Sequence, residues 1–159
     1  MKRPEIKTMQ NLESAFAGES MAHIKYRYFA KLARAAGDEE TALTFEATAD
    51  QEVAHAFGHL DLLYPAAEMT PAKALQIAID GETYEYSEMY PGFRKTAVEE
   101  GNAAAVAEMD EQIEESRVHA AQFKAVLEKA AKRFAALAKV EERHANHYQQ
   151  ALNKLTARS

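Results

Sequence analysis

The stretch Ala49-Asp-Gln-Glu52-Val-Ala-His55-Ala places a carboxylate and an imidazole three residues apart within a helical pattern. Side chains at positions i and i+3 are neighbours on a helix, so Glu52 and His55 share one face. Phe45 and Leu62 continue that face in both directions. An apolar stripe of this kind predicts contact with a protein core. Two polar side chains of metal-ligand type are therefore expected in the middle of a buried seam.

The rest of the chain predicts an all-α fold. Gly (6) and Pro (4) are scarce, apolar residues recur at spacings of three and four, and no segment alternates as a strand does. Helix boundaries are indicated by Gly37-Asp38, by Tyr64-Pro65 and by Gly101-Asn102. The expected helices cover about residues 8–36, 39–63, 70–100 and 103–155.

The last two segments have special features. Pro91-Gly92 predicts a kink in the third helix. Residues 103–155 contain neither Pro nor Gly, and the apolar rhythm persists throughout. This segment predicts either one very long helix or a helical hairpin. Short connections between such helices predict an antiparallel four-helix bundle.

A carboxylate interrupts the apolar seam of every helix. Burying an ionised carboxylate without a partner costs several kcal/mol, so a group of them requires a cation. A Glu from one helix and Glu-x-x-His from two others is the ligand pattern of dimetal–carboxylate bundles. The candidate metal ligands are Glu19, Glu52, His55, Glu82, Glu85, Glu141 and His144.

The donor types predict which metal binds. Oxygen donors with one imidazole per ion favour two iron ions, with manganese as the alternative. The chain has no Cys, which excludes disulfides and thiolate-bound metals within it. The competing interpretation is a purely structural bundle whose Glu residues are surface charges, and metal analysis distinguishes the two.

Length and charge limit the function further. The 159 residues predict a single domain, and the formal net charge of −6 argues against nucleic acid or an anionic membrane as the main partner. No stretch approaches the ~20 apolar residues of a membrane span, and residues 1–8 contain no apolar leader. A cytoplasmic protein is expected.

Four segments carry a recognisable family pattern: Phe16-Ala-Gly-Glu19-Ser, Thr48-Ala-Asp-Gln-Glu52-Val-Ala-His55-Ala, Gly81-Glu82-Thr-Tyr-Glu85-Tyr-Ser-Glu-Met-Tyr90-Pro91 and Phe134-Ala-Ala-Leu-Ala-Lys-Val-Glu141-Glu-Arg-His144. Together they resemble the rubrerythrin family. The resemblance implies a ferritin-like bundle with a diiron site that reduces hydrogen peroxide to water in defence against oxidative stress. It also implies residue roles: Glu52 and Glu141 bridge the irons, Glu19 and Glu82 are terminal, His144 holds one iron, His55 and Glu85 alternate on the other, and Tyr26 and Tyr90 line the site.

Two departures from the family pattern bear on partners and on the last ligands. Without paired C-x-x-C motifs, electrons are expected from a separate rubredoxin-like protein or reductase. Glu19 and Glu52 are 33 residues apart, whereas Glu82 and Glu141 are 59 apart, which indicates a helical insertion at about residues 103–130. Glu115 lies 33 residues beyond Glu82 and is followed by His119, so this pair is a rival placement. Glu141 and His144 are preferred because their whole surrounding segment matches.

The insertion also predicts assembly. It carries an apolar stripe that should not stay exposed, so a homodimer is expected, with exchange of the last helix between chains as one arrangement. The alternative function is iron oxidation and storage in a ferritin-like shell.

Overall fold

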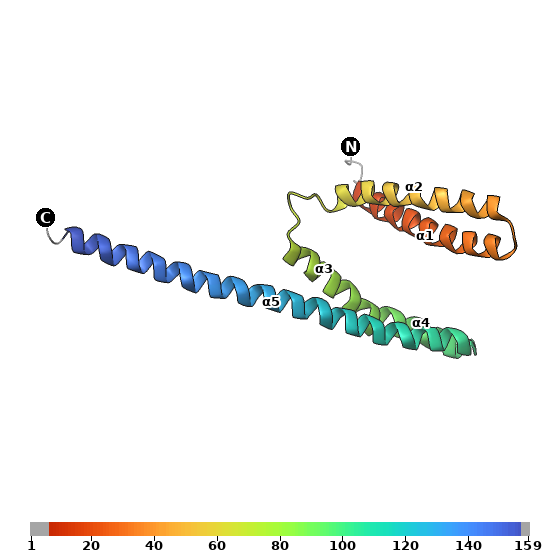
Figure 1. The fold of residues 1–159 in the computed structure, drawn as a ribbon. Coiled ribbons are helices and arrows are strands. Elements are labelled where there is room, and N and C mark those ends of the chain that lie inside the picture. Colours follow the sequence, from red (N-terminus) through yellow and green to blue (C-terminus); the bar gives the residue numbers. More distant parts are fainter. Residues whose placement is uncertain (1–6, 157–159) are drawn as a thin grey trace, which may run out of the picture. The chain divides into compact units, whose positions relative to one another are not determined.

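A computed structural model describes residues 7–156, and Figure 1 shows its helices. The helical elements are α1 (Thr8–Ala35), α2 (Glu39–Leu63), α3 (Pro71–Tyr84), the π-helical turn η1 (Glu85–Met89), α4 (Tyr90–Glu99) and α5 (Ala103–Thr156). Within the described range there is no strand, which confirms the all-α prediction. None of these helices is long and apolar enough to cross a membrane.

The predicted helix boundaries are confirmed, and local chemistry explains them. Gly37 and Gly101 take the left-handed conformation after α1 and α4, with φ of +84° and +70°. The Thr70 side chain then accepts the backbone N–H of Lys73 at 3.2 Å and caps α3. The Asn102 side chain accepts the N–H of Ala105 at 3.1 Å at the start of α5.

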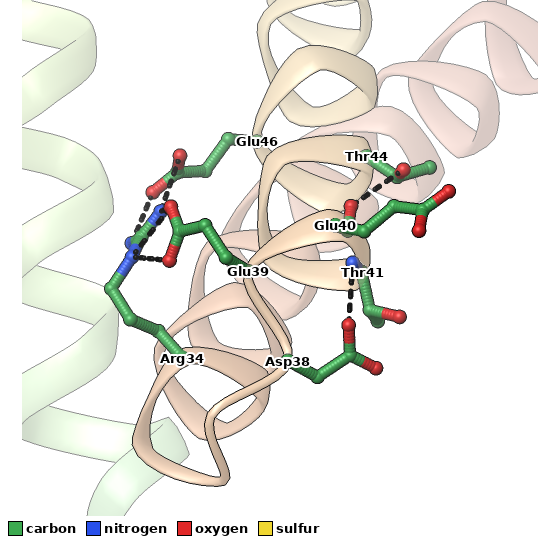
Figure 2. Close-up of polar contacts among 7 residues, drawn as sticks. All are labelled: Arg34, Asp38, Glu39, Glu40, Thr41, Thr44 and Glu46. Carbon is green, nitrogen blue, oxygen red and sulfur yellow. Dashed lines mark hydrogen bonds and ion pairs between the residues drawn. The ribbon is translucent and has the colours of Figure 1, made fainter.

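The start of α2 is fixed by charged contacts (Figure 2). Asp38 accepts the N–H of Thr41 at 3.0 Å, and this hydrogen bond lowers the pKa of the Asp38 carboxyl. The Arg34 guanidinium donates to Glu39 at 2.9 Å and to Glu46 at 2.8 Å. These bonds raise the pKa of Arg34 and lower that of Glu46. These contacts therefore connect the end of α1 to the start of α2 and stabilise the turn between them.

The described part of the chain forms two compact units, which divide between Met69 and Thr70. In the first unit α1 and α2 pack as an antiparallel pair through small side chains. His23 Nδ1 donates to the Ala49 carbonyl at 2.8 Å, and Arg27 pairs with Asp50. The residues buried in this unit are Ala30, Ala42, Ala49 and Ala56.

In the second unit, α3, η1 and α4 pack against the first half of α5 (Figure 1). The buried residues here are again small, namely Ala97, Ser116 and Ala120. Arg94 of α4 forms an ion pair with Asp110 of α5. The turn at Gly101 makes the two stretches antiparallel, so α3 and η1 lie beside the part of α5 that contains Ser116 and His119.

The irregularity expected at Pro91-Gly92 takes the form of a π-helical turn just before Pro91. Proline has no N–H, so it cannot donate to the Ser87 carbonyl as an α-helix requires. The preceding N–H, that of Tyr90, donates instead to the Glu85 carbonyl, which gives the wider π turn. Such turns often occur at functional sites, and this one begins at a predicted metal ligand.

The last helix, α5, is continuous over 54 residues. At 1.5 Å per residue it extends about 81 Å. The prediction of one very long helix is confirmed, and the alternative of a helical hairpin is wrong. All of residues 131–150 except Val140 are exposed in this chain.

Candidate metal centre

The first cluster consists of Glu19 on α1 with Glu52 and His55 on α2. One ligand atom from each residue lies within 4.8 Å of the others. His55 Nδ1 is 2.8 Å from Glu52 Oε2 and 4.0 Å from Glu19 Oε1. Two carboxylates and an imidazole converging from two helices are a suitable donor set for a divalent cation.

The turn at Gly37 explains why this cluster forms. Glu19 and Glu52 lie at similar distances before and after the turn, so the antiparallel helices bring them level. The bond from His23 to the Ala49 carbonyl lies one turn away and fixes the rotation of α1 against α2. His23 therefore supports the cluster through a contact with the backbone of α2.

The second cluster lies in the other unit, where Glu82 of α3 and Glu85 of η1 face α5. Ser116 Oγ donates to Glu85 Oε2 at 3.0 Å. His119 Nδ1 is 3.4 Å from Glu82 Oε1. Glu82 Oε2 is buried and has no hydrogen-bond partner among the described residues. A buried carboxylate oxygen without a partner is costly, and a bound cation would satisfy it.

The two predicted tyrosines lie in different units. Tyr90 follows η1, and burial together with the charges of Glu85, Glu82 and Glu108 raises the pKa of its hydroxyl. The hydroxyl therefore keeps its proton and can donate a hydrogen bond. Tyr26 lies two turns beyond Glu19 on α1, where its ring packs against Phe45 at 5.8 Å.

Glu141 and His144 are not brought to Glu82 and Glu85 within this chain. They lie on the far part of α5, 3.8 Å from each other, with 76% and 59% of their side chains exposed. Glu141 is 22 residues beyond His119, which is about 33 Å along a continuous helix.

In the structure, the two residues of the alternative pair, Glu115 and His119, have different surroundings. Glu115 is exposed, whereas His119 contacts Glu82. The sequence-based preference for Glu141 and His144 therefore excluded His119, which contacts the predicted metal ligand Glu82.

Sequence reasoning also missed Ser116, which is 3% exposed. The helical periodicity of the sequence could have indicated Ser116. Met109, Ser116 and Phe123 are spaced seven residues apart and therefore lie on one face of α5. Glu115, one residue away, lies about 100° around the helix.

The donor atoms of both clusters belong to carboxylate and imidazole groups, which suit iron or manganese. The family model for rubrerythrin matches residues 10–127 of this sequence. The chain belongs to the rubrerythrin family. The rubrerythrin match includes Ser116 and His119 and ends before Glu141 and His144.

Named relatives agree with this assignment. Nigerythrin of Nitratidesulfovibrio vulgaris is 43% identical over 115 residues, which cover 62% of this chain and 55% of the relative. Rubrerythrin of Porphyromonas gingivalis is 39% identical over 106 residues, covering 60% of this chain and 53% of that protein. The chain thus spans about half the length of the curated rubrerythrins it matches.

A solved structure described as the fully reduced, all-ferrous state of nigerythrin is also similar. It is 36% identical, with a TM-score of 0.40, and the match covers 82% of this chain and 70% of the nigerythrin chain. Membership of the rubrerythrin family gives this chain the ferritin-like helical fold expected from its sequence.

Proposed function

We propose that this chain is a non-haem diiron peroxidase that reduces hydrogen peroxide to water with electrons from a separate donor protein. The observation that carries the proposal is the convergence of Glu19, Glu52 and His55 within 4.8 Å in a rubrerythrin-family chain. The unpartnered oxygen of Glu82 supports it from the other unit. In this proposal Glu19, Glu52, His55, Glu82 and Glu85 bind two iron ions.

Two bound ferrous ions would supply one electron each, two in all, and with two protons these electrons convert one hydrogen peroxide molecule into two water molecules. The carboxylates of the two clusters offset the positive charge, which rises by two when the electrons leave. By the family resemblance, Glu85 would offer a further carboxylate to the oxidised iron in exchange for His55. In the chain without metal, the Ser116 hydroxyl donates to Glu85 Oε2 at 3.0 Å and holds that carboxylate in position.

Tyr90 has the properties of a proton-bearing group beside the carboxylates. Its raised pKa keeps the hydroxyl protonated near neutral pH. It can donate a hydrogen bond to an oxygen atom of peroxide or of its products. Tyr26 is assigned the same role in the first unit from its place two turns beyond Glu19.

Glu141 and His144 remain proposed ligands on the strength of the sequence resemblance. Because they lie about 33 Å along α5 from His119, a second copy of the chain would have to supply them. A homodimer with shared ligands is therefore part of the proposed assembly.

Stopped-flow mixing tests the proposal. The chain is loaded with ferrous iron without oxygen, its iron content is measured, and the protein is mixed with hydrogen peroxide or with dioxygen. We expect two irons per chain and oxidation by peroxide at least about tenfold faster than by dioxygen, a difference of roughly 1.4 kcal/mol in barrier. Equal rates would reject the peroxidase, and iron loading far above two per chain would favour storage.

Two single substitutions within the η1 turn provide a matched comparison. Glu85→Ala should slow oxidation by peroxide while the iron content stays near two. Glu88→Ala changes an exposed carboxylate of the same turn and should leave the rate unchanged. An unaffected peroxide rate in Glu85→Ala would contradict the proposed ligand exchange.

A further inference from the structure

Helix α5 contains the same residue pattern twice. The first copy reads Ser116-x-x-His119-Ala120-x-x-Phe123-x-x-x-Leu127, and the second reads Glu141-x-x-His144-Ala145-x-x-Tyr148-x-x-x-Leu152. The two are offset by 25 residues, and the offset also pairs Met109 with Phe134. We name residues 109–127 the proximal segment and residues 134–152 the distal segment. The main difference is a serine in one copy where the other has a glutamate.

The repeat distance places both copies on one side of the helix. Twenty-five residues of α-helix are close to seven complete turns of 3.6 residues. The distal segment therefore presents the same face as the proximal segment, about 38 Å further along. A surface that accepts one copy has a shape suited to the other.

The structure shows which surface that is. The proximal segment lies against α3, η1 and α4, with Ser116 bonded to Glu85 and His119 next to Glu82. In the distal segment the corresponding face is exposed: Phe134 is 72% and Tyr148 is 70% exposed. Large apolar side chains in a row on one helix face indicate a protein contact.

We propose that the distal segment binds, in a second copy of this chain, the surface of α3 and η1 that the proximal segment covers in its own chain. It thereby delivers Glu141 and His144 to Glu82 and Glu85. The inference deepens the proposed function, because the delivered residues are its missing ligands. A second copy is the occupant because α5 is continuous, and no Gly or Pro lies between Leu127 and Phe134 to allow folding back.

Electrostatics explain why the chain carries both copies. Ser116 is neutral and donates a hydrogen bond to Glu85, so it suits the surface without a cation. Glu141 in that place adds a third carboxylate to Glu82 and Glu85, and the three repel one another unless cations lie among them. The proximal segment thus covers the surface of α3 and η1 when no metal is bound. The distal segment of a second copy replaces it there when metal is bound.

The charge of the distal segment supports docking on another copy. The chain as a whole has a net charge of −6. Basic residues exceed acidic ones in and just before the distal segment, whereas the reverse holds for the first part of α5. The basic residues are Lys129, Lys132, Arg133, Lys139 and Arg143. Opposite charges favour encounter between this end of α5 and the acidic remainder of a second chain.

Cysteine cross-linking tests the proposal in the full chain, which has no native cysteine. Phe93 lines a hollow together with Met109, the residue that Phe134 would replace. The single variants Phe93→Cys and Phe134→Cys are mixed and treated with a short bismaleimide, with or without ferrous iron in the absence of oxygen. We expect covalent heterodimers whose yield rises about tenfold with iron. Replacing Phe134→Cys by Ala136→Cys, which lies on another face of α5, should abolish them.

A second variant isolates the electrostatic argument. Glu141→Ser gives the distal segment the side chain that the proximal one has. Cross-linking without iron should then rise to the yield that the parent pair reaches with iron. An unchanged low yield would contradict the repulsion of three carboxylates as the cause of the iron dependence.

Other outcomes overturn the proposal. A Phe93→Cys/Phe134→Cys double variant that forms only internal cross-links at high dilution would show that the helix folds back within its own chain. Absence of heterodimers with iron present would reject docking, even where the peroxide reaction is retained. Heterodimers formed by a protein that peroxide and dioxygen oxidise equally fast would support docking and reject the peroxidase.

Discussion

At the scale of single residues, the first cluster is arranged for a cation. Glu52 Oε2 and Glu19 Oε1 both approach the same nitrogen of His55, at 2.8 and 4.0 Å. That imidazole nitrogen can bind a metal only when it carries no proton. Metal binding is therefore expected to exchange the Glu52–His55 contact for bonds from each residue to the ion.

Glu52→Gln should weaken metal binding with little change of shape. The amide keeps the volume of the side chain but removes the negative charge that attracts a cation. We expect at least about a tenfold loss of affinity for ferrous iron, measured by anaerobic titration. Glu13→Gln on the exposed side of α1 is the control and should bind as the parent does. Equal affinity of the two variants would place the metal elsewhere.

Asp38→Ala should destabilise the first unit in a pH-dependent way. The hydrogen bond from Thr41 lowers the pKa of Asp38 below 3.8, so its contribution to stability is present above that pH and is lost as pH falls through the lowered value. Denaturant unfolding should show a destabilised variant at neutral pH and a smaller difference in strong acid. Asp38→Asn keeps a capping side chain and should retain most of the stability at neutral pH. A difference independent of pH would contradict this account.

At the scale of elements, the π turn of η1 is the main departure from regular helix. It starts at Glu85 and results from the missing N–H of Pro91. A π turn changes the direction of the side chains that follow it, so the placement of Tyr90 relative to Glu85 depends on this turn. The same chain position would face elsewhere in a continuous α-helix.

Pro91→Ala should stabilise the helix and impair the site. Alanine restores the N–H that can bond to the Ser87 carbonyl, which favours regular α-helix. We expect a higher unfolding temperature together with a slower reaction with peroxide, measured on the same iron-loaded sample. Pro71→Ala is the control, because Pro71 occupies the first turn of α3, where an N–H has no helical partner. A faster reaction in Pro91→Ala would contradict the role of the π turn.

At the scale of the whole molecule, large apolar side chains remain exposed while the buried residues are small. Phe57 of α2, Phe93 of α4 and Phe134 of α5 are all more than half exposed in this chain. A pair of helices buries only one face of each, so further packing is needed to cover the others. Packing against a second copy in the predicted homodimer would cover such faces.

Size-exclusion chromatography with light scattering of the chain loaded with ferrous iron in the absence of oxygen should show a dimer at micromolar concentration. Phe134→Asp places a charge in the apolar face of the distal segment and should shift the protein toward monomer. Ala136→Asp, on another face of α5, should leave the dimer intact. A parent chain that is monomeric at this concentration would contradict the prediction.

The sequence by itself determined the helices and the first cluster. Caps at Asp38, Thr70 and Asn102 act within a few residues, and glycines at positive φ end helices locally. Glu19, Glu52 and His55 follow from the same local information, because one short turn fixes the level of two antiparallel helices. The separation of the two clusters along the sequence does not determine their relative positions in the same way.

Only the tertiary structure decided which residues of α5 meet Glu82 and Glu85. One residue along a helix turns the side chain by about 100°, so the choice between Glu115 and Ser116 depends on the rotation with which α5 docks on α3. The choice between His119 and His144 depends on α5 remaining unbroken after Leu127. Tertiary structure decides both choices, because the proximal and distal segments of α5 have similar sequences. They differ in their distance from the turn at Gly101, which determines where each segment lies relative to α3.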